Sequence, residues 1–373
     1  MKSNPMKQHK FLNPNALAPF DTYAKKRHTI DCGLGTNPLG EPPAVKDFWK
    51  TYMHKPVDKY YDPGLLAQLS ARLSEYANIP VERLFFHNGS MQMLSTLFFK
   101  LFTQHPKLMM GIGPQFAEPI EEWLLSGGKY ISAQLGKADN LDLTVNKIIK
   151  RISSTQPTVV FMDNPNNPTG LFFSVESIER IAIACQQTGT YLIVDEAFAD
   201  YLPVTSSAMN LTDHLPNIFV VRSFSKALGM ASIRLGYCIV PNTLIKYLER
   251  IIIQFTPAEI SIDLACHVLP TINDFLLKSR HYIRQGKKEI TESFRQKGFH
   301  IWPTHCDVPI FLAYHKEIPL YKWLKDLDVN TVSGEHFAIT CSEMNDHYCR
   351  VRVPGCKADI AYLIHRVNNF GIH

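Results

Sequence analysis

Short apolar runs alternate with amphipathic stretches between residues 80 and 240, and polar or turn-forming residues follow each run. This alternation predicts an α/β architecture in which a mostly parallel sheet lies between helices. The predicted strands cover Leu108 to Ile112, Val159 to Met162, Tyr191 to Val194 and Ile218 to Val221. Ligands of such open sheets bind outside the carboxyl ends of the strands, so functional residues are expected there.

The pattern changes after residue 240, where long helical periodicities replace the alternation. One predicted helix covers Thr243 to Ile253, and a second covers Ser261 to about Lys297 with a bend or break near Pro270. From Phe299 onward, strand-like segments such as Ile310 to Tyr314 mix with amphipathic stretches and predict a smaller α+β domain. The predicted division is an N-terminal segment over 1–50, a large domain over 51–260, and a linking helix with the small domain over 261–373.

Composition excludes several classes of function. The chain has 373 residues, of which 45% are hydrophobic, and this is enough to fill two cores. The net charge of +5 is spread over 39 basic and 34 acidic residues without long blocks of one sign, so nucleic acid is not an expected partner. The eight cysteines form no Cys-x-x-Cys pair, so we expect reduced thiols and no metal site.

The beginning of the chain does not resemble an export signal. The first 20 residues contain Pro, Asn and Lys where a signal peptide has an unbroken apolar segment. No later run is expected to reach the length of a membrane span. The sequence therefore predicts a soluble, cytoplasmic protein without a membrane partner.

A lysine follows one of the predicted buried strands, in the segment Ser223-Phe224-Ser225-Lys226. A single lysine on a loop is by default a surface residue. Here two serine hydroxyls and the guanidinium of Arg234 bracket the lysine, and this set suits a phosphate held beside an imine. A lysine that forms an imine needs a lowered amine pKa, which desolvation or neighbouring positive charge supplies.

Two further motifs follow neighbouring predicted strands. Asp195 stands at the end of the apolar run Tyr191 to Val194, where an unpaired carboxylate is costly to bury. It either faces a cationic ring such as a protonated pyridine or caps a following helix. The segment 164–170, Asn-Pro-Asn-Asn-Pro-Thr-Gly, has the composition of a turn. The turn, the acid and the lysine follow three consecutive predicted strands in this order. This combination indicates a function far more specifically than any one of the three motifs.

These three segments resemble the core motifs of the class I and II, fold-type I, pyridoxal-phosphate aminotransferases. The matching segments are NPNNPTG at 164–170, VDEAF at 194–198 and SFSKALGMASIRLGY at 223–237. The nearest branch holds histidinol-phosphate aminotransferases and threonine-phosphate decarboxylases, and the likeness extends from about Asn37 to Arg350. The resemblance implies a large domain with a mostly parallel seven-stranded sheet, pyridoxal 5′-phosphate as cofactor, and a homodimer with shared active sites.

The resemblance also implies roles for individual residues. Lys226 is expected to form the Schiff base with the cofactor, Asp195 to bind the pyridine nitrogen, and Asn167 to bind the phenolic oxygen. Phe116 is expected to stack on the ring, although without the family it would equally be a core residue. The residues expected around the phosphate are Asn88, Gly89, Ser90, Ser223, Ser225, Arg234 and, from the neighbouring subunit, Tyr60.

Two residues are expected to bind the amino-acid substrate, namely Asn37 and Arg350. A guanidinium suits this role because it binds an α-carboxylate through two parallel hydrogen bonds. Arg352 is an alternative to Arg350, since strand alternation places both on one face.

The sequence departs from the family at two positions. Phe198 replaces a tyrosine whose hydroxyl also bonds the phenolic oxygen, and losing this donor is expected to raise the pKa of the imine. Tyr314 is the best match to an arginine that histidinol-phosphate enzymes place near the end of that strand. Without this cation a substrate phosphate loses a strong partner, which argues against histidinol phosphate as the natural substrate.

The expected activity is transamination of an amino acid with an oxo-acid acceptor. Lys226 would move the α-proton while Asp195 keeps the pyridine nitrogen protonated. One alternative is α-decarboxylation, which the same pocket performs when the carboxylate stands perpendicular to the ring. Another is a protein that keeps the fold for binding but has lost turnover.

Overall fold

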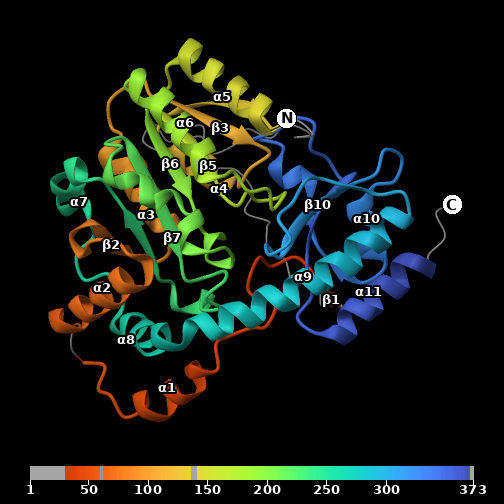
Figure 1. Ribbon diagram of the computed structural model, residues 1–373, viewed down its shortest axis with the longest axis horizontal. Helices are drawn as coiled ribbons and strands as arrows, with labels where there is room; N and C mark the ends of the chain where they lie inside the picture. Colours follow the sequence, from red (N-terminus) through yellow and green to blue (C-terminus); the bar gives the residue numbers. More distant parts are fainter. Residues whose placement is uncertain (1–29, 59, 61, 136–140, 370–373) are drawn as a thin grey trace, which may run out of the picture.

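A computed structural model describes residues 30–58, 60, 62–135 and 141–369 (Figure 1). A seven-stranded sheet organises the larger part of the chain, in the order β2-β8-β7-β6-β5-β3-β4. β8 runs antiparallel to both of its neighbours, and the pairs among β3 to β7 are parallel. The expected α/β class and mostly parallel seven-stranded sheet are therefore confirmed. The strands are β2 (Leu84–His87), β3 (Leu108–Gly113), β4 (Lys129–Gln134), β5 (Val159–Asp163), β6 (Tyr191–Asp195), β7 (Ile218–Ser223) and β8 (Gly236–Ile239).

Alternate residues of the central strands enter two separate hydrophobic clusters, one on each face of the sheet. Val160, Leu192 and Val220 belong to the cluster that also contains apolar residues of α2, α5 and α6. Phe161 and Ile193 belong to the cluster completed by α3, α4 and α7. Because both faces are buried, the strands read as continuous apolar runs. The helices are α2 (Pro63–Ala77), α3 (Ser90–Thr96), α4 (Glu118–Leu125), α5 (Leu141–Thr155), α6 (Val175–Gln187) and α7 (Ile245–Ile251).

The smaller part of the chain is built on a four-stranded antiparallel sheet in the order β12-β13-β10-β9. A short strand near the beginning of the described chain, β1, pairs in parallel with β11 of this part. This pairing agrees with the expected contribution of the N-terminal segment to the small domain, while the boundaries at residues 50 and 260 stay predictions. The elements are β1 (Ile30–Asp31), β9 (His300–Ile301), β10 (Ile310–Tyr314), β11 (Val329–Asn330), β12 (Val332–Ser333), β13 (Tyr348–Arg352), α1 (Ala44–Tyr52), α10 (Leu320–Asp326) and α11 (Lys357–Asn369).

A long helical segment connects the two parts, as Figure 1 shows. It consists of α8 (Glu259–Val268), a 3₁₀ turn at Leu269–Thr271 and α9 (Ile272–Gln296), so the expected break near Pro270 is confirmed. By length and composition the stretch Glu259–Gln296 could cross a membrane, which corrects the expectation that no run reaches that length. Its apolar window is 56% buried, and α8 packs against α1 and α2, which explains the apolar composition.

Lys287 on α9 attaches the linking helix to a loop of the small domain. Its buried Nζ lies within hydrogen-bonding distance of four oxygens, at 2.6 Å from Thr304 Oγ1 and 2.8 Å from each of the carbonyl oxygens of His305, Val308 and Ile310. The N–H of His305 in turn donates to the carbonyl of Gly170, at the end of the 164–170 turn. This chain of contacts fixes the small domain against the loop that follows β5.

Candidate active site

Three neighbouring parallel strands end at the same edge of the large sheet. In the register of these strands Asp163 at the end of β5 lies beside Asp195 at the end of β6, and Asp195 lies beside Val221 near the end of β7. The turn at 164–170, the acid and the loop with Lys226 follow these ends directly. The structure therefore brings the three sequence motifs together, as expected from parallel pairing.

Lys226 lies beside cationic and aromatic groups. Burial lowers the pKa of its amine to about 8, and the charge of Arg350 acts in the same direction, while Asp195 opposes both. Its Nζ is 5.5 Å from the centroid of the Phe198 ring. A Cβ atom added to Gly35 would lie 3.3 Å from this Nζ. A glycine therefore allows the segment between β1 and α1, residues 32–43 (the entry segment), to approach the lysine closely. The lowered pKa provides a neutral amine near physiological pH.

Asp195 is buried at the end of β6, and burial raises the pKa of its carboxyl to about 6. Its Oδ1 accepts the N–H of Ala197 at 2.9 Å, so the local capping interaction considered from the sequence is present. The charge of Lys226 lowers the same pKa, which indicates that a cation close to this carboxylate stabilises its ionised form. Capping and cation binding are therefore compatible here.

A cradle suited to an anion forms where α3 begins. Arg234 donates from Nη1 to Ser225 Oγ at 3.2 Å, and Ser223 Oγ accepts the N–H of Ser225 at 3.1 Å. A Cβ atom on Gly89 would be 2.5 Å from Arg234 Nη2, so only glycine allows the guanidinium to lie against the start of the helix at Ser90. Free N–H groups at a helix start and a guanidinium together favour a phosphate. Asn88 precedes this start, and its N–H donates to Gln92 Oε1 at 3.0 Å.

The buried carboxylate of Asp163 joins two predicted cofactor ligands. It accepts the backbone N–H of Asn167 at 2.8 Å and that of Phe116 at 3.2 Å. Asp163 was not predicted from the sequence, although it has the same signal as Asp195, an acid at the end of an apolar strand. A neighbouring network, also missed, consists of Arg222 between Glu196 and Asp200, with a distance of 2.9 Å to Asp200.

The two candidate arginines on β13 have different partners. Arg350 donates from Nη1 to Asn167 Oδ1 at 2.9 Å and from Nη2 to the carbonyl of Gly33, and its charge acts on Lys226. Arg352 instead donates to the carbonyl and carboxylate oxygens of Asp31, at 2.7 and 3.1 Å. This difference favours Arg350 as the substrate ligand, a role that stays a prediction.

The amide of Asn37 is already bound within the protein. Its Nδ2 donates to the carbonyl of Ala227 at 2.7 Å and to Ser279 Oγ at 2.9 Å, and its Oδ1 accepts the N–H of Leu39. Asn37 thus holds the entry segment against both the lysine loop and α9. Its expected contact with substrate stays a prediction.

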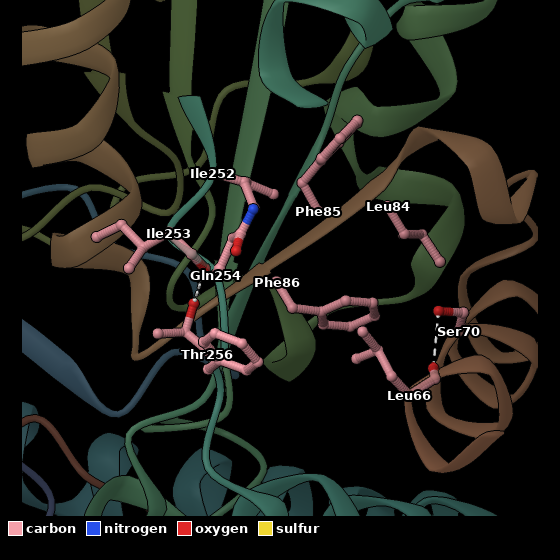
Figure 2. Close-up of a pocket in the computed structure, with 10 residues that line it drawn as sticks. Leu66, Ser70, Leu84, Phe85, Phe86, Ile252, Ile253, Gln254 and Thr256 are labelled. Atoms are coloured by element: carbon pink, nitrogen blue, oxygen red, sulfur yellow. Dashed lines mark hydrogen bonds between the residues drawn. The ribbon is translucent and has the colours of Figure 1, made fainter. Parts of the chain in front are cut away.

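Tyr60 lies on the surface of the chain, with 75% of its area exposed. It stacks on Phe255, itself 59% exposed, with the ring centroids 4.4 Å apart. Phe255 also lines an apolar pocket of about 390 Å³ along the edge strand β2 (Figure 2). The residues lining this pocket include none of the predicted cofactor ligands. It is therefore a surface feature separate from the lysine site.

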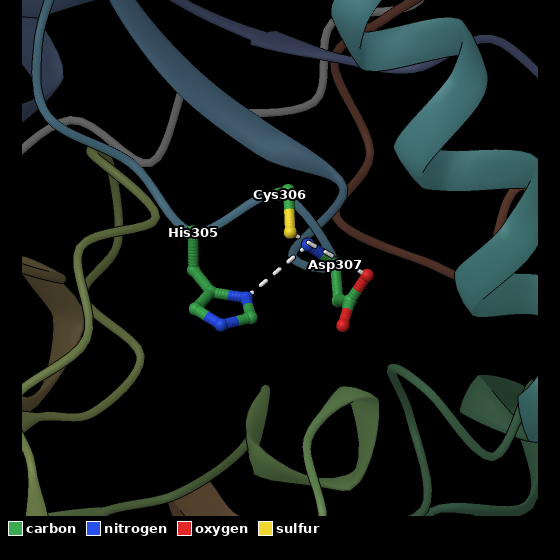
Figure 3. Close-up of side chains that lie close together, drawn as sticks. All are labelled: His305, Cys306 and Asp307. Carbon is green, nitrogen blue, oxygen red and sulfur yellow. Dashed lines mark hydrogen bonds between the residues drawn. The ribbon is translucent and has the colours of Figure 1, made fainter.

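One cluster of potential metal ligands occurs in the described part of the chain, at His305, Cys306 and Asp307 (Figure 3). The ligand atoms lie within 4.8 Å of one another. Both carboxylate oxygens of Asp307 accept hydrogen bonds from Arg284, at 2.9 and 3.0 Å, and His305 Nδ1 accepts the N–H of Asp307. Because a guanidinium already neutralises the carboxylate, this arrangement is poorly suited to a cation.

Comparisons with known proteins agree with this geometry. The model of the family described as aminotransferase class I and II matches residues 27–367. Histidinol-phosphate aminotransferase 2 of Legionella pneumophila is 25% identical over 80% of this chain and 79% of its own length. Histidinol-phosphate aminotransferase of Thermoanaerobacter sp. is 28% identical over 86% of each chain.

Solved structures share the fold at low sequence identity. Histidinol-phosphate aminotransferase from Sinorhizobium meliloti, in complex with pyridoxal-5′-phosphate, aligns with a TM-score of 0.81 at 16% identity, covering 97% of this chain and 98% of the other. A variant of Thermus thermophilus aspartate aminotransferase aligns with a TM-score of 0.79 at 17% identity, covering 96% and 99%.

Two lysines with lowered amine pKa values provide a test of which amine is reactive. Burial lowers the pKa of Lys226 to about 8 and that of Lys287 to about 7. Incubation with pyridoxal phosphate followed by borohydride reduction is expected to label Lys226 alone, because four oxygen acceptors surround Lys287 Nζ. Labelling of the apoprotein should accelerate as pH rises through about 8 and then level off, since the neutral amine reacts.

Peptide mass spectrometry identifies the labelled lysine in this experiment. Labelling of Lys287 in place of Lys226 would contradict the assignment. So would a rate that keeps rising to about pH 10, as for an ordinary lysine.

Proposed function

The chain belongs to the class I and II aminotransferase family and catalyses pyridoxal-phosphate-dependent transamination, and we propose that Lys226 and Asp195 carry the chemistry. The bound cofactor supplies an aldehyde carbon that captures amines and a cationic ring that withdraws electrons from the substrate α-carbon. The substrates of the enzyme are small amino and oxo acids. The side chains of the protein bind and orient these molecules and transfer the proton.

The residues at the sheet edge fit this cofactor. Gly89, Ser90, Ser223, Ser225 and Arg234 would hold the phosphate, because Arg234 lies against Gly89 at the start of α3 and donates to Ser225, whose N–H donates to Ser223. Asp195 would keep a proton on the pyridine nitrogen, where a cation offsets the cost of burying its carboxylate. Phe116 would pack on the ring, and Asn167 would donate to the phenolic oxygen.

Lys226 Nζ would accept the proton from the substrate α-carbon and later return it to the cofactor side. Burial and Arg350 lower the pKa of this amine to about 8, so it is able both to accept and to release a proton near neutral pH. The close approach of Gly35 covers the amine and limits access of water. Phe198 adds an apolar surface on the same side without a hydroxyl donor.

The hydrogen bond from Arg350 to Asn167 is the observation that favours transamination over decarboxylation. If Asn167 binds the phenolic oxygen, Arg350 would hold the substrate carboxylate on the same side of the site as Asn167. A carboxylate held there by the guanidinium would leave the α-proton as the group that Lys226 removes. Loss of that proton begins transamination, whereas decarboxylation needs the carboxylate to leave.

We further propose a cytoplasmic homodimer that acts on an α-amino acid. Histidinol phosphate is a second candidate substrate, supported by the names of the relatives at 25 and 28% identity. Against it, the best match to the arginine of histidinol-phosphate enzymes is Tyr314, whose ring stacks on that of Tyr348 with the centroids 4.3 Å apart. The exposed rings of Tyr60 and Phe255, beside an apolar pocket along an edge strand, support a partner subunit on this surface.

A single-turnover experiment distinguishes the candidate reactions. Holoenzyme is mixed in turn with amino acids, threonine phosphate and histidinol phosphate. An α-amino acid is expected to give one oxo acid per bound cofactor, while the cofactor absorbance changes to that of pyridoxamine phosphate. Carbon dioxide release without need for an oxo-acid acceptor would favour decarboxylation. A cofactor absorbance that no amine changes would favour a binding protein.

Replacing each arginine by glutamine tests which one binds the carboxylate. Arg350→Gln is expected to lower kcat/KM for the amino acid about 100-fold, because a charged pair in a buried site is lost. Arg352→Gln is expected to change kcat/KM only a few-fold, since Arg352 is bound to Asp31. Steady-state kinetics decide, and a larger effect in Arg352→Gln would reverse the assignment.

Mixed dimers test the proposed sharing of sites. Tyr60→Ala is expected to weaken binding of pyridoxal phosphate about tenfold, the effect of one lost hydrogen bond to a charged group. Co-expression with Lys226→Ala should restore tight binding at one site per mixed dimer, because the Lys226→Ala subunit supplies an intact Tyr60. Fluorescence titration measures both classes of site. Failure to restore binding would place Tyr60 at its own subunit's site, and unchanged affinity in Tyr60→Ala would place it at no site.

A further inference from the structure

Asp163 is a buried acid that the proposed reaction does not use directly. It ends β5, is 5% exposed, and lies beside Asp195 in the parallel register of β5 and β6. Two neighbouring carboxylates in a buried site repel one another, and removing each from water is costly. Burial and the charge of Asp195 accordingly raise the pKa of Asp163 to about 7. An acid in this position therefore needs compensating contacts.

Those contacts come from two different loops. Oδ2 of Asp163 accepts the backbone N–H of Asn167 at 2.8 Å and the backbone N–H of Phe116 at 3.2 Å. Oδ1 accepts Asn166 Nδ2 at 3.1 Å. Both N–H bonds to Oδ2 lower the pKa of Asp163 and so favour its ionised form. A single carboxylate thus joins the loop after β3 to the turn after β5.

Asn166 fixes the orientation of this connection. Its Nδ2 also donates to the carbonyl of Pro114 at 2.9 Å, and its Oδ1 accepts the hydroxyl of Thr169 at 2.6 Å. Since its oxygen is engaged by Thr169, Asn166 presents its amide hydrogens to Asp163. The side chain at position 163 is therefore surrounded by N–H groups that donate hydrogen bonds. A carboxylate suits this position because both of its oxygens accept hydrogen bonds.

We propose that Asp163 is a positioning residue, whose carboxylate sets where the Phe116 ring and the Asn167 amide meet the cofactor. The inference rests on the proposed cofactor site and deepens it. Asp163 reaches the cofactor through these two residues. Its loss should therefore move properties of the bound cofactor that depend on Asn167 and Phe116.

The pH midpoint of the holoenzyme's cofactor absorbance is the property to measure. A donor to the phenolic oxygen favours its negative form, so displacing Asn167 should raise the midpoint. Asp163→Ala is expected to raise it by about one pH unit, the effect of one lost hydrogen bond. Asp163→Asn keeps one acceptor oxygen but turns an amide toward Asn166, and a smaller rise is expected. Affinity for pyridoxal phosphate should fall in the same order.

A double variant separates positioning from a general effect of charge. If Asp163 acts through Asn167, then Asp163→Ala combined with Asn167→Ala should have the midpoint of Asn167→Ala alone. Additive shifts would overturn the proposal, as would an unchanged midpoint in Asp163→Ala. If the alanine variant does not fold, an unchanged midpoint in Asp163→Asn is equally decisive against it.

A matched control is available in Asp307→Asn. Asp307 is also buried and accepts two hydrogen bonds, but from Arg284 on the linking helix. Its replacement is expected to leave the midpoint unchanged, and a shift equal to that of Asp163→Asn would overturn positioning as the cause. A wild-type holoenzyme without a Lys226-dependent absorbance band would instead refute the proposed function.

Discussion

The parallel register of β5, β6 and β7 is the constraint on which the site depends. It aligns Asp163 with Asp195 and brings the turn after β5 and the lysine loop after β7 to the same edge. The apolar side chains of these strands enforce the register, because both faces are buried and a shift by one residue would exchange the two hydrophobic clusters. The relative positions of the site residues are therefore determined by the packing of apolar side chains within the sheet, away from the site itself.

Bringing charged groups to one buried edge has an electrostatic cost, which appears as shifts in the pKa values of these groups. Burial raises the pKa of Asp163 and Asp195 and lowers that of Lys226. A ligand with a cationic nitrogen at one end and a phosphate at the other would offset much of this cost, with Arg234 at the phosphate end. The same burial that strains the site without ligand thus favours the cofactor that it binds.

The small domain contributes to the site through a few specific contacts. Arg350 reaches Asn167 and the carbonyl of Gly33, and Lys287 secures the loop that meets Gly170. Asn37 connects the entry segment with both the lysine loop and the linking helix. Substrate binding by Arg350 would therefore act on the same contacts that hold the two parts of the molecule together.

The amino-acid sequence alone is sufficient to predict the α/β class and to identify the three motifs and their order along the central strands. Local physics is sufficient for these, since apolar runs, turn residues and a break at Pro270 depend only on neighbours in the chain. The contacts of each side chain, in contrast, follow only from the folded arrangement. Alternation along one strand leaves Arg350 and Arg352 equivalent. In the folded chain they differ, because Arg350 donates to Asn167 whereas Arg352 donates to Asp31. The folded arrangement also reveals Asp163 as the link between Phe116 and Asn167, because these two residues are far apart in the sequence and only folding brings them together. Tyr60 lies exposed on the surface of the structure, which its sequence position did not indicate.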